Sequence, residues 1–101
     1  ARFRGSVPYR DNGEDRSAVF QFRELGKAQA MGALSGLFKI VAEEGTGKLL
    51  GVHIAGAHAS DLIAEATFAL QKGCSARDLF ETIHAHPTLS EGLYEAAGML
   101  A

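Results

Sequence analysis

The sequence predicts an α+β fold in which helices cover one face of an antiparallel sheet. Between residues 18 and 55, apolar and polar residues alternate in several short runs, which is the periodicity of β-strands. After Gly56 the apolar residues recur every three or four positions, which is the periodicity of helices. The length of 101 residues suits one core, so residues 1–101 are expected to form a single domain.

Three strands are predicted from the alternating runs. In the first, Ala18, Phe20 and Phe22 share one face. The other two are separated by the glycine-containing turn 44–47, so they are expected to pair as an antiparallel hairpin. The predicted strands cover residues 18–23, 37–43 and 48–55.

Two segments outside these strands have weaker patterns. Residues 27–31, after Gly26, are expected to be extended as well. Residues 1–16 mix arginines, acidic residues, glycines and a proline without a sustained period. We expect them to form a loosely held arm, with a short strand around Val7 and Tyr9.

Three helices are predicted in the second half of the chain. The first carries an apolar stripe, is expected to begin at Ser60 as its N-cap, and stops before Gly73. A short second helix should open with Ser75 as its cap, since Asp78 follows three residues later. The third is expected from Thr88 to Leu100. The stripe of the first helix consists of Leu62, Ile63, Ala66, Ala69 and Leu70.

The composition excludes several classes of partner and compartment. A formal net charge of −2 gives no reason to expect nucleic acid or an anionic membrane as a partner. No apolar run approaches the ~20 residues that span a bilayer, and the N-terminus has no signal-peptide pattern. The single cysteine, Cys74, cannot form an internal disulfide, which fits a reducing compartment. A cytoplasmic location is therefore expected.

The segment 84–91 is the candidate for chemistry. Pro87 disfavours a helical conformation at His86, so His86 should end a loop while Glu91 lies in the first turn of the third helix. The two side chains can then converge, and an imidazole oriented by a carboxylate is a common general acid–base catalyst. Without further support, an ordinary histidine before a helix is the more common explanation of His86, because short motif matches are often false positives.

Glu91 has a structural alternative. The spacing from Thr88 to Glu91 fits a capping box, in which each side chain bonds the backbone amide of the other residue. The capping and orienting roles are compatible, because a carboxylate has two oxygens.

The four histidines also raise the question of a metal site. His84 and His86 form a His-x-His pair, and His53 and His58 lie upstream. Zinc usually requires a third and a fourth ligand held close by, and no pattern in the sequence supplies them. No metal site is predicted.

Beyond this spacing, the segment His84-Ala-His-Pro-Thr-Leu-Ser-Glu91 resembles the C-terminal active-site motif of dihydrolipoamide dehydrogenases. These belong to the flavin- and pyridine-nucleotide-dependent disulfide oxidoreductases. The segments Gly26–Gly32, Gly47–Gly56 and Ala59–Glu65 resemble the interface domain of that family and follow in the same order. The resemblance covers about residues 17–101. Before Ser17 the chain departs from the family, whose opening strand usually contains Pro-Glu.

The resemblance implies the fold of an FAD/NAD-linked reductase dimerisation domain and a role for each site residue. It implies a homodimer in which His86 of one subunit takes a proton from dihydrolipoamide at the disulfide and flavin of the other. It also implies that Glu91 orients His86. The backbone of His86 and Pro87 is expected to lie near the partner's FAD, and the His86–Pro87 bond is expected to be cis.

The chain lacks other parts of such an enzyme. It has one cysteine where the family uses a redox-active pair, and its glycines do not form a dinucleotide-binding loop. We therefore expect an isolated dimerisation domain that is inactive alone and binds no cofactor by itself, with FAD and NAD used by the intact enzyme. Its expected partners are a second copy, the FAD and NAD domains of the parent chain, and a lipoyl-bearing subunit of a 2-oxo acid dehydrogenase complex. Two alternatives stay open: a stand-alone homodimerising module without catalysis, and the same domain of a related disulfide reductase.

Overall fold

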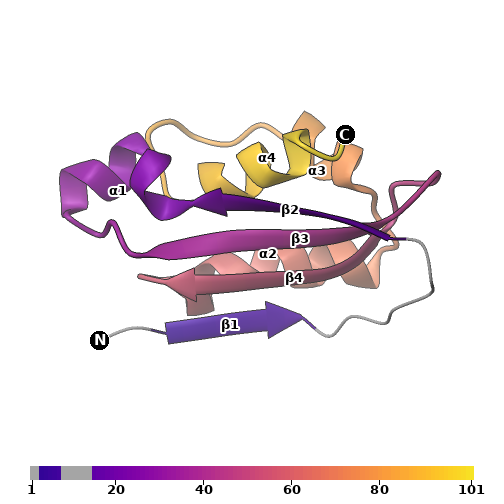
Figure 1. Cartoon of the computed structure of the whole chain (residues 1–101), viewed down its shortest axis with the longest axis horizontal. Helices are drawn as coiled ribbons and strands as arrows, with labels where there is room; N and C mark the ends of the chain where they lie inside the picture. The colour runs from indigo at the N-terminus through magenta and orange to yellow at the C-terminus, as the bar shows by residue number, and fades with distance from the viewer. Residues whose placement is uncertain (1–2, 8–14) are drawn as a thin grey trace.

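The computed structural model describes the backbone of residues 3–7 and all of residues 15–101. Within these residues, four strands form one antiparallel sheet in the order β1-β4-β3-β2 (Figure 1). The strands are β1 (Phe3–Val7), β2 (Asp15–Gln21), β3 (Gly36–Glu43) and β4 (Leu49–Gly56). The predicted hairpin is confirmed, because β3 pairs with β4 in antiparallel register with one irregularity between Val41 and Ala42.

The first strand is an edge strand. Its backbone pairs with β4 from Phe3 opposite Gly56 to Val7 opposite Val52. The short strand expected near Val7 is therefore present, although it lies earlier in the chain than predicted. The expectation for Tyr9 lies outside the described residues.

The strand β2 corresponds to the predicted strand 18–23, but it begins and ends earlier in the chain. It starts at Asp15 and stops at Gln21, where Phe22–Glu24 form a 3₁₀ turn. The expected extended run over residues 27–31 is wrong, because Gly26–Met31 form the helix α1. Four of the five residues from 27 to 31 are lysine, alanine or glutamine, which are good helix formers, and none is β-branched. Gly32, at φ 73°, ends the helix in the left-handed conformation.

The predicted helices are present with shifted ends. They are α2 (Ala59–Gln71), α3 (Ala76–Glu81) and α4 (Glu91–Gly98). Ser60 is not the N-cap of α2: His58 precedes the helix, and its carbonyl accepts from the N–H groups of Asp61 and Leu62 at 3.0 Å each. The helix α4 begins three residues later than predicted, because Leu89 and Ser90 form a turn before it.

The capping box predicted for α3 is confirmed. The Ser75 hydroxyl accepts from the Asp78 N–H at 3.2 Å, and the Asp78 carboxylate accepts from the Ser75 N–H at 2.8 Å. Both bonds satisfy backbone N–H groups that an uncapped helix leaves without a partner.

Removing this cap should measurably destabilise the domain. Ser75→Ala is expected to lower the free energy of unfolding by about 0.5–2 kcal/mol, measured by urea denaturation. The matched control is Ser60→Ala, because Ser60 is an exposed serine in the first turn of α2 that does not serve as its cap. Ser60→Ala should change stability by no more than about 0.5 kcal/mol. Equal losses in the two variants would contradict this assignment of the caps.

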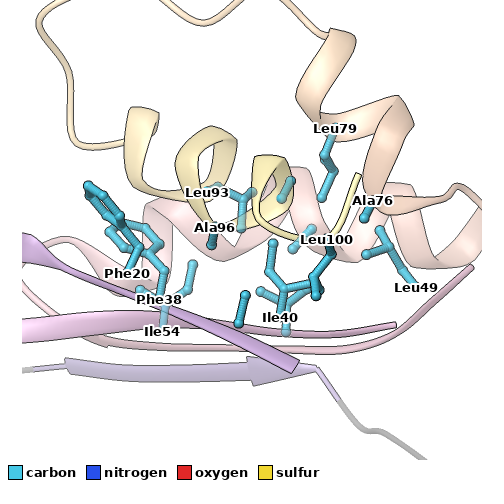
Figure 2. Close-up of a cluster of buried hydrophobic side chains, with 14 of the residues drawn as sticks. Phe20, Phe38, Ile40, Leu49, Ile54, Ala76, Leu79, Leu93, Ala96 and Leu100 are labelled. Atoms are coloured by element: carbon cyan, nitrogen blue, oxygen red, sulfur yellow. The ribbon is translucent and has the colours of Figure 1, made fainter. Parts of the chain in front are cut away.

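The hydrophobic core lies between the sheet and the helices α2 and α4. One row of core side chains crosses the sheet through Phe20, Phe38 and Ile54, which are register partners on β2, β3 and β4. The helix α4 packs on β2 and β3, whereas α2 packs on β4 and β1. Figure 2 shows Leu93 and Ala96 of α4 directed toward this row. The predicted α+β class, with helices on one face of an antiparallel sheet, is confirmed.

The Phe22 and Phe38 rings stack inside this core, with centroids 4.7 Å apart. Both side chains are fully buried. Across the described part of the chain, no helix is both long enough and apolar enough to span a bilayer.

Candidate active site

The loop between α3 and α4 carries the candidate site. It covers residues 82–90, and Ala85, His86 and Pro87 at its centre are exposed. The Thr88 hydroxyl donates to the Ala85 carbonyl at 2.6 Å and is 2.9 Å from the Ser90 hydroxyl. The His86–Pro87 peptide bond is cis, as the resemblance implied.

His86 and Glu91 converge as the spacing predicted. The Nδ1 atom of His86 lies 2.9 Å from each carboxylate oxygen of Glu91, which is the first residue of α4. The His86 side chain is 77% exposed and the Glu91 side chain 19% exposed. With Nδ1–H donating to the carboxylate, neutral His86 keeps its lone pair on Nε2. This arrangement leaves a general base that an external proton donor can reach.

Glu91 also contributes to the start of α4. Its Oε1 accepts from the Thr88 N–H at 2.9 Å, which is one half of the predicted capping box. The other half is absent: the Thr88 hydroxyl bonds Ala85, and no side chain caps the helix at Ser90. The capping and orienting contacts of Glu91 therefore coexist.

These contacts set the charge of Glu91. The Thr88 N–H is the largest influence that holds the pKa of Glu91 below its usual value of 4.5, and the hydrogen bond and charge of His86 act in the same direction. Desolvation acts in the opposite direction and is outweighed. Near neutral pH Glu91 is therefore an anion whose carboxylate accepts from Nδ1 of His86 and orients the ring.

The lowered pKa predicts how stability depends on pH. In the folded chain Glu91 titrates below 4.5, so its stabilising contribution is complete above that pH and is lost as the pH falls through the folded-state value. Glu91→Gln should therefore be less stable than the original chain at pH 7, and this difference should shrink on acidification. Urea denaturation over a range of pH measures it. Glu95→Gln is the matched control, because it removes the same charge from an exposed side chain of α4. A stability difference for Glu91→Gln that does not change with pH would contradict the assignment.

The other histidines do not join this pair in a metal site. His53 lies on β4 opposite Lys39, on the face of the sheet away from the core. His58 is exposed, with Nδ1 3.7 Å from the Asp61 carboxylate. Among the residues that the structure describes, no cluster of three or more histidine, cysteine or acidic side chains could hold a metal ion. Cys74 is half-buried against the core.

A second histidine–carboxylate pair was not predicted. Nε2 of His84 lies 2.6 Å from Oε2 of Glu65, which belongs to α2. The His-x-His spacing makes His84 a candidate metal ligand, but no local pattern links it to a residue 19 positions earlier.

Comparison with known proteins identifies the family. The pyridine nucleotide-disulphide oxidoreductase dimerisation domain matches residues 10–97. The chain belongs to this family. It is therefore a dimerisation domain of the disulfide oxidoreductases, and the membership that the sequence motifs implied is confirmed.

Relatives in this family place the chain close to dihydrolipoyl dehydrogenases. It is 52% identical over 81 residues to dihydrolipoyl dehydrogenase of Thermus scotoductus, covering 80% of this chain and 18% of the relative. It is 46% identical over 84 residues to the mitochondrial dihydrolipoyl dehydrogenase of Pisum sativum, covering 83% of this chain and 17% of the relative. The chain thus spans about a fifth of the length of these relatives.

A solved structure supports the same assignment. LpdA from Mycobacterium tuberculosis superimposes with a TM-score of 0.83 at 28% identity, covering 86% of this chain and 19% of that chain. The fold expected for a dimerisation domain of a disulfide oxidoreductase is therefore the fold observed.

Proposed function

We propose that this chain is the dimerisation domain of a dihydrolipoyl dehydrogenase and that His86, oriented by Glu91, is the acid–base group of that enzyme. The observation that carries the proposal is the exposed His86 ring, whose Nδ1 is fixed by a carboxylate at 2.9 Å. The near relatives that bear the name dihydrolipoyl dehydrogenase support the choice of reaction.

In this reaction His86 moves one proton at each of two thiol–disulfide exchanges. Nε2 takes the proton from one thiol of dihydrolipoamide, and the thiolate sulfur attacks a redox-active disulfide. One sulfur–sulfur bond forms while the enzyme's bond breaks, so a mixed disulfide and a cysteine thiolate result. The imidazolium returns its proton to that cysteine thiolate, and Nε2 then takes the proton of the second substrate thiol. The second thiolate breaks the mixed disulfide, so that lipoamide leaves oxidised and the cysteine pair is reduced. Glu91 stabilises the imidazolium between these steps.

The disulfide must come from outside this chain, which contains one cysteine. We assign it, with the flavin, to the partner subunit of a homodimer. Bound FAD would carry the two electrons from the cysteine pair to NAD. The features of this chain that fit the approach of such a group are the exposed imidazole and the backbone of His86, whose N–H and C=O have no hydrogen bond to any described residue. The backbone of His86 and Pro87 would lie against the flavin.

The wider setting follows from the same proposal. The domain would be joined to FAD and NAD domains of its parent chain and would act on a lipoyl-bearing subunit of a 2-oxo acid dehydrogenase complex. A reducing compartment such as the cytoplasm suits a cycling cysteine pair.

The first test is the subunit mass, the visible absorption spectrum and the substrate of the protein purified from its native source. The proposal predicts a subunit several-fold heavier than 10.7 kDa that contains bound flavin and reduces NAD with dihydrolipoamide. A colourless protein of about this mass would instead support a stand-alone dimerising module. A flavoprotein that turns over another disulfide but not lipoamide would support a related reductase.

A further inference from the structure

The His84 side chain is enclosed between two hydrogen-bond acceptors. Its Nδ1 lies 2.8 Å from the Thr82 carbonyl oxygen, and its Nε2 lies 2.6 Å from Oε2 of Glu65. The His84 side chain is only 6% exposed, whereas that of Glu65 is 31% exposed. Unlike His86, His84 is therefore not available to a substrate.

These two contacts fix the number of protons that the pair holds. A carbonyl oxygen only accepts, so Nδ1 of His84 must carry hydrogen. If Nε2 carried none, its lone pair would face an ionised carboxylate at 2.6 Å, which is repulsive. One further proton must therefore lie between His84 and Glu65, and the bond is charge-assisted if His84 holds both protons.

A third residue also encloses the imidazole. The ring of Tyr94 on α4 lies 5.7 Å from the His84 ring, centroid to centroid.

This hydrogen-bonded pair ties the loop of the candidate site to α2. His84 precedes His86 by two residues, and Glu65 lies in the middle of α2, which packs on β4 and β1. At its other end the loop is fixed by the bonds from Thr88 and His86 to Glu91. The exposed segment of Ala85, His86 and Pro87 is thus held from both sides.

We propose that His84 and Glu65 are a positioning pair, which fixes the loop 82–87 on α2 and thereby sets where Nε2 of His86 meets the substrate thiol. This inference rests on the proposed function, because it assigns the pair to the acid–base step of His86. His84 acts through the loop and does not touch the substrate.

A double-mutant cycle in the full-length flavoenzyme tests the pair. His84→Ala and Glu65→Ala are each expected to lower kcat for dihydrolipoamide about tenfold to a hundredfold, with little change in KM, because a base displaced by about 1 Å loses that much. The double variant should lose about as much as either single variant, since both remove the same link. The proposed positioning pair would be overturned if the two losses in kcat multiplied in the double variant, or if neither single variant lost kcat.

Two further variants separate a positioning role from a general loss of structure or of flavin chemistry. Glu65→Gln can still hydrogen-bond His84, so its loss in kcat should be about fivefold or less. Glu81→Gln is the matched control, because it removes a carboxylate from an exposed ion pair with Arg77 and should leave kcat unchanged. Reduction of ferricyanide by NADH needs no thiol deprotonation and should be the same in all variants. An equal loss in this reaction, or a Glu65→Gln variant as slow as Glu65→Ala, would overturn the positioning role.

The outcome for His86 distinguishes the two proposals. If His86→Gln kept normal turnover of dihydrolipoamide, the proposed function would fail. If His86→Gln lost turnover while His84→Ala and Glu65→Ala kept it, only the positioning pair would be wrong.

Discussion

Replacing His86 with glutamine in the full-length enzyme is expected to lower kcat for dihydrolipoamide by about 10²–10⁴-fold, which is the usual contribution of a general base. The glutamine amide can still donate a hydrogen bond to Glu91, so the loop should keep its shape, but it cannot take a proton from a thiol. Steady-state reduction of NAD by dihydrolipoamide measures the loss.

The controls for this variant separate proton transfer from folding. The flavin should remain bound, and reduction of ferricyanide by NADH should continue, because neither needs a base at residue 86. His58→Asn is a matched histidine control, because His58 is exposed and its φ of 61° is one that asparagine tolerates. Normal dihydrolipoamide turnover in His86→Gln would contradict the assignment of the base.

The second large effect is expected at Gly92, where α4 crosses the sheet. A Cβ atom at this position would lie 2.0 Å from Cε1 of Phe38 and 2.5 Å from its Cζ. The Phe38 ring has little room to move aside, because it is fully buried and stacked on Phe22 at 4.7 Å. Either the ring or the helix must shift, and Glu91 is the residue immediately before Gly92 on that helix.

Gly92→Ala is therefore expected to lower the free energy of unfolding by about 1–3 kcal/mol, measured by urea denaturation. Alanine is the better helix former by about 1 kcal/mol, so a net loss requires the overlap with Phe38 to outweigh that gain. Gly26→Ala in the first turn of α1 is the matched control, since its Cβ would meet nothing within 4 Å. Gly26→Ala should be neutral or slightly stabilising. If Gly92→Ala were as stable as the original chain, the close packing of α4 on Phe38 would be contradicted.

The features that could be predicted from the sequence are those determined by neighbouring residues. The β3–β4 hairpin follows from alternation on both sides of a glycine turn, and the α3 cap from Ser75 and Asp78. The run 27–31 was misassigned because five residues are too few to separate a strand period from a helical one. Ser60 was misassigned as a cap because its residue type suits the position, whereas the backbone carbonyl of His58 starts the helix.

Of the two histidine–carboxylate contacts at the candidate site, one could be predicted from the sequence. Pro87 and the helix start allow His86 and Glu91 to converge, and their distance of 2.9 Å confirms that geometry. The family membership is confirmed as well, whereas the catalytic role of the pair stays a proposal. The contact between His84 and Glu65 could not be predicted, because it depends on how α2 packs beside the loop and on no spacing within either segment.

The central claim is that His86 serves a disulfide on the other subunit, and hybrid dimers test it most directly. One subunit would carry His86→Gln, and the other would have its redox-active cysteines replaced by serine. Each parent homodimer should be inactive. The purified hybrid should regain about half of the original turnover, because one of its two sites then combines an intact His86 with an intact cysteine pair from different subunits. A hybrid as inactive as its parents would contradict the shared site.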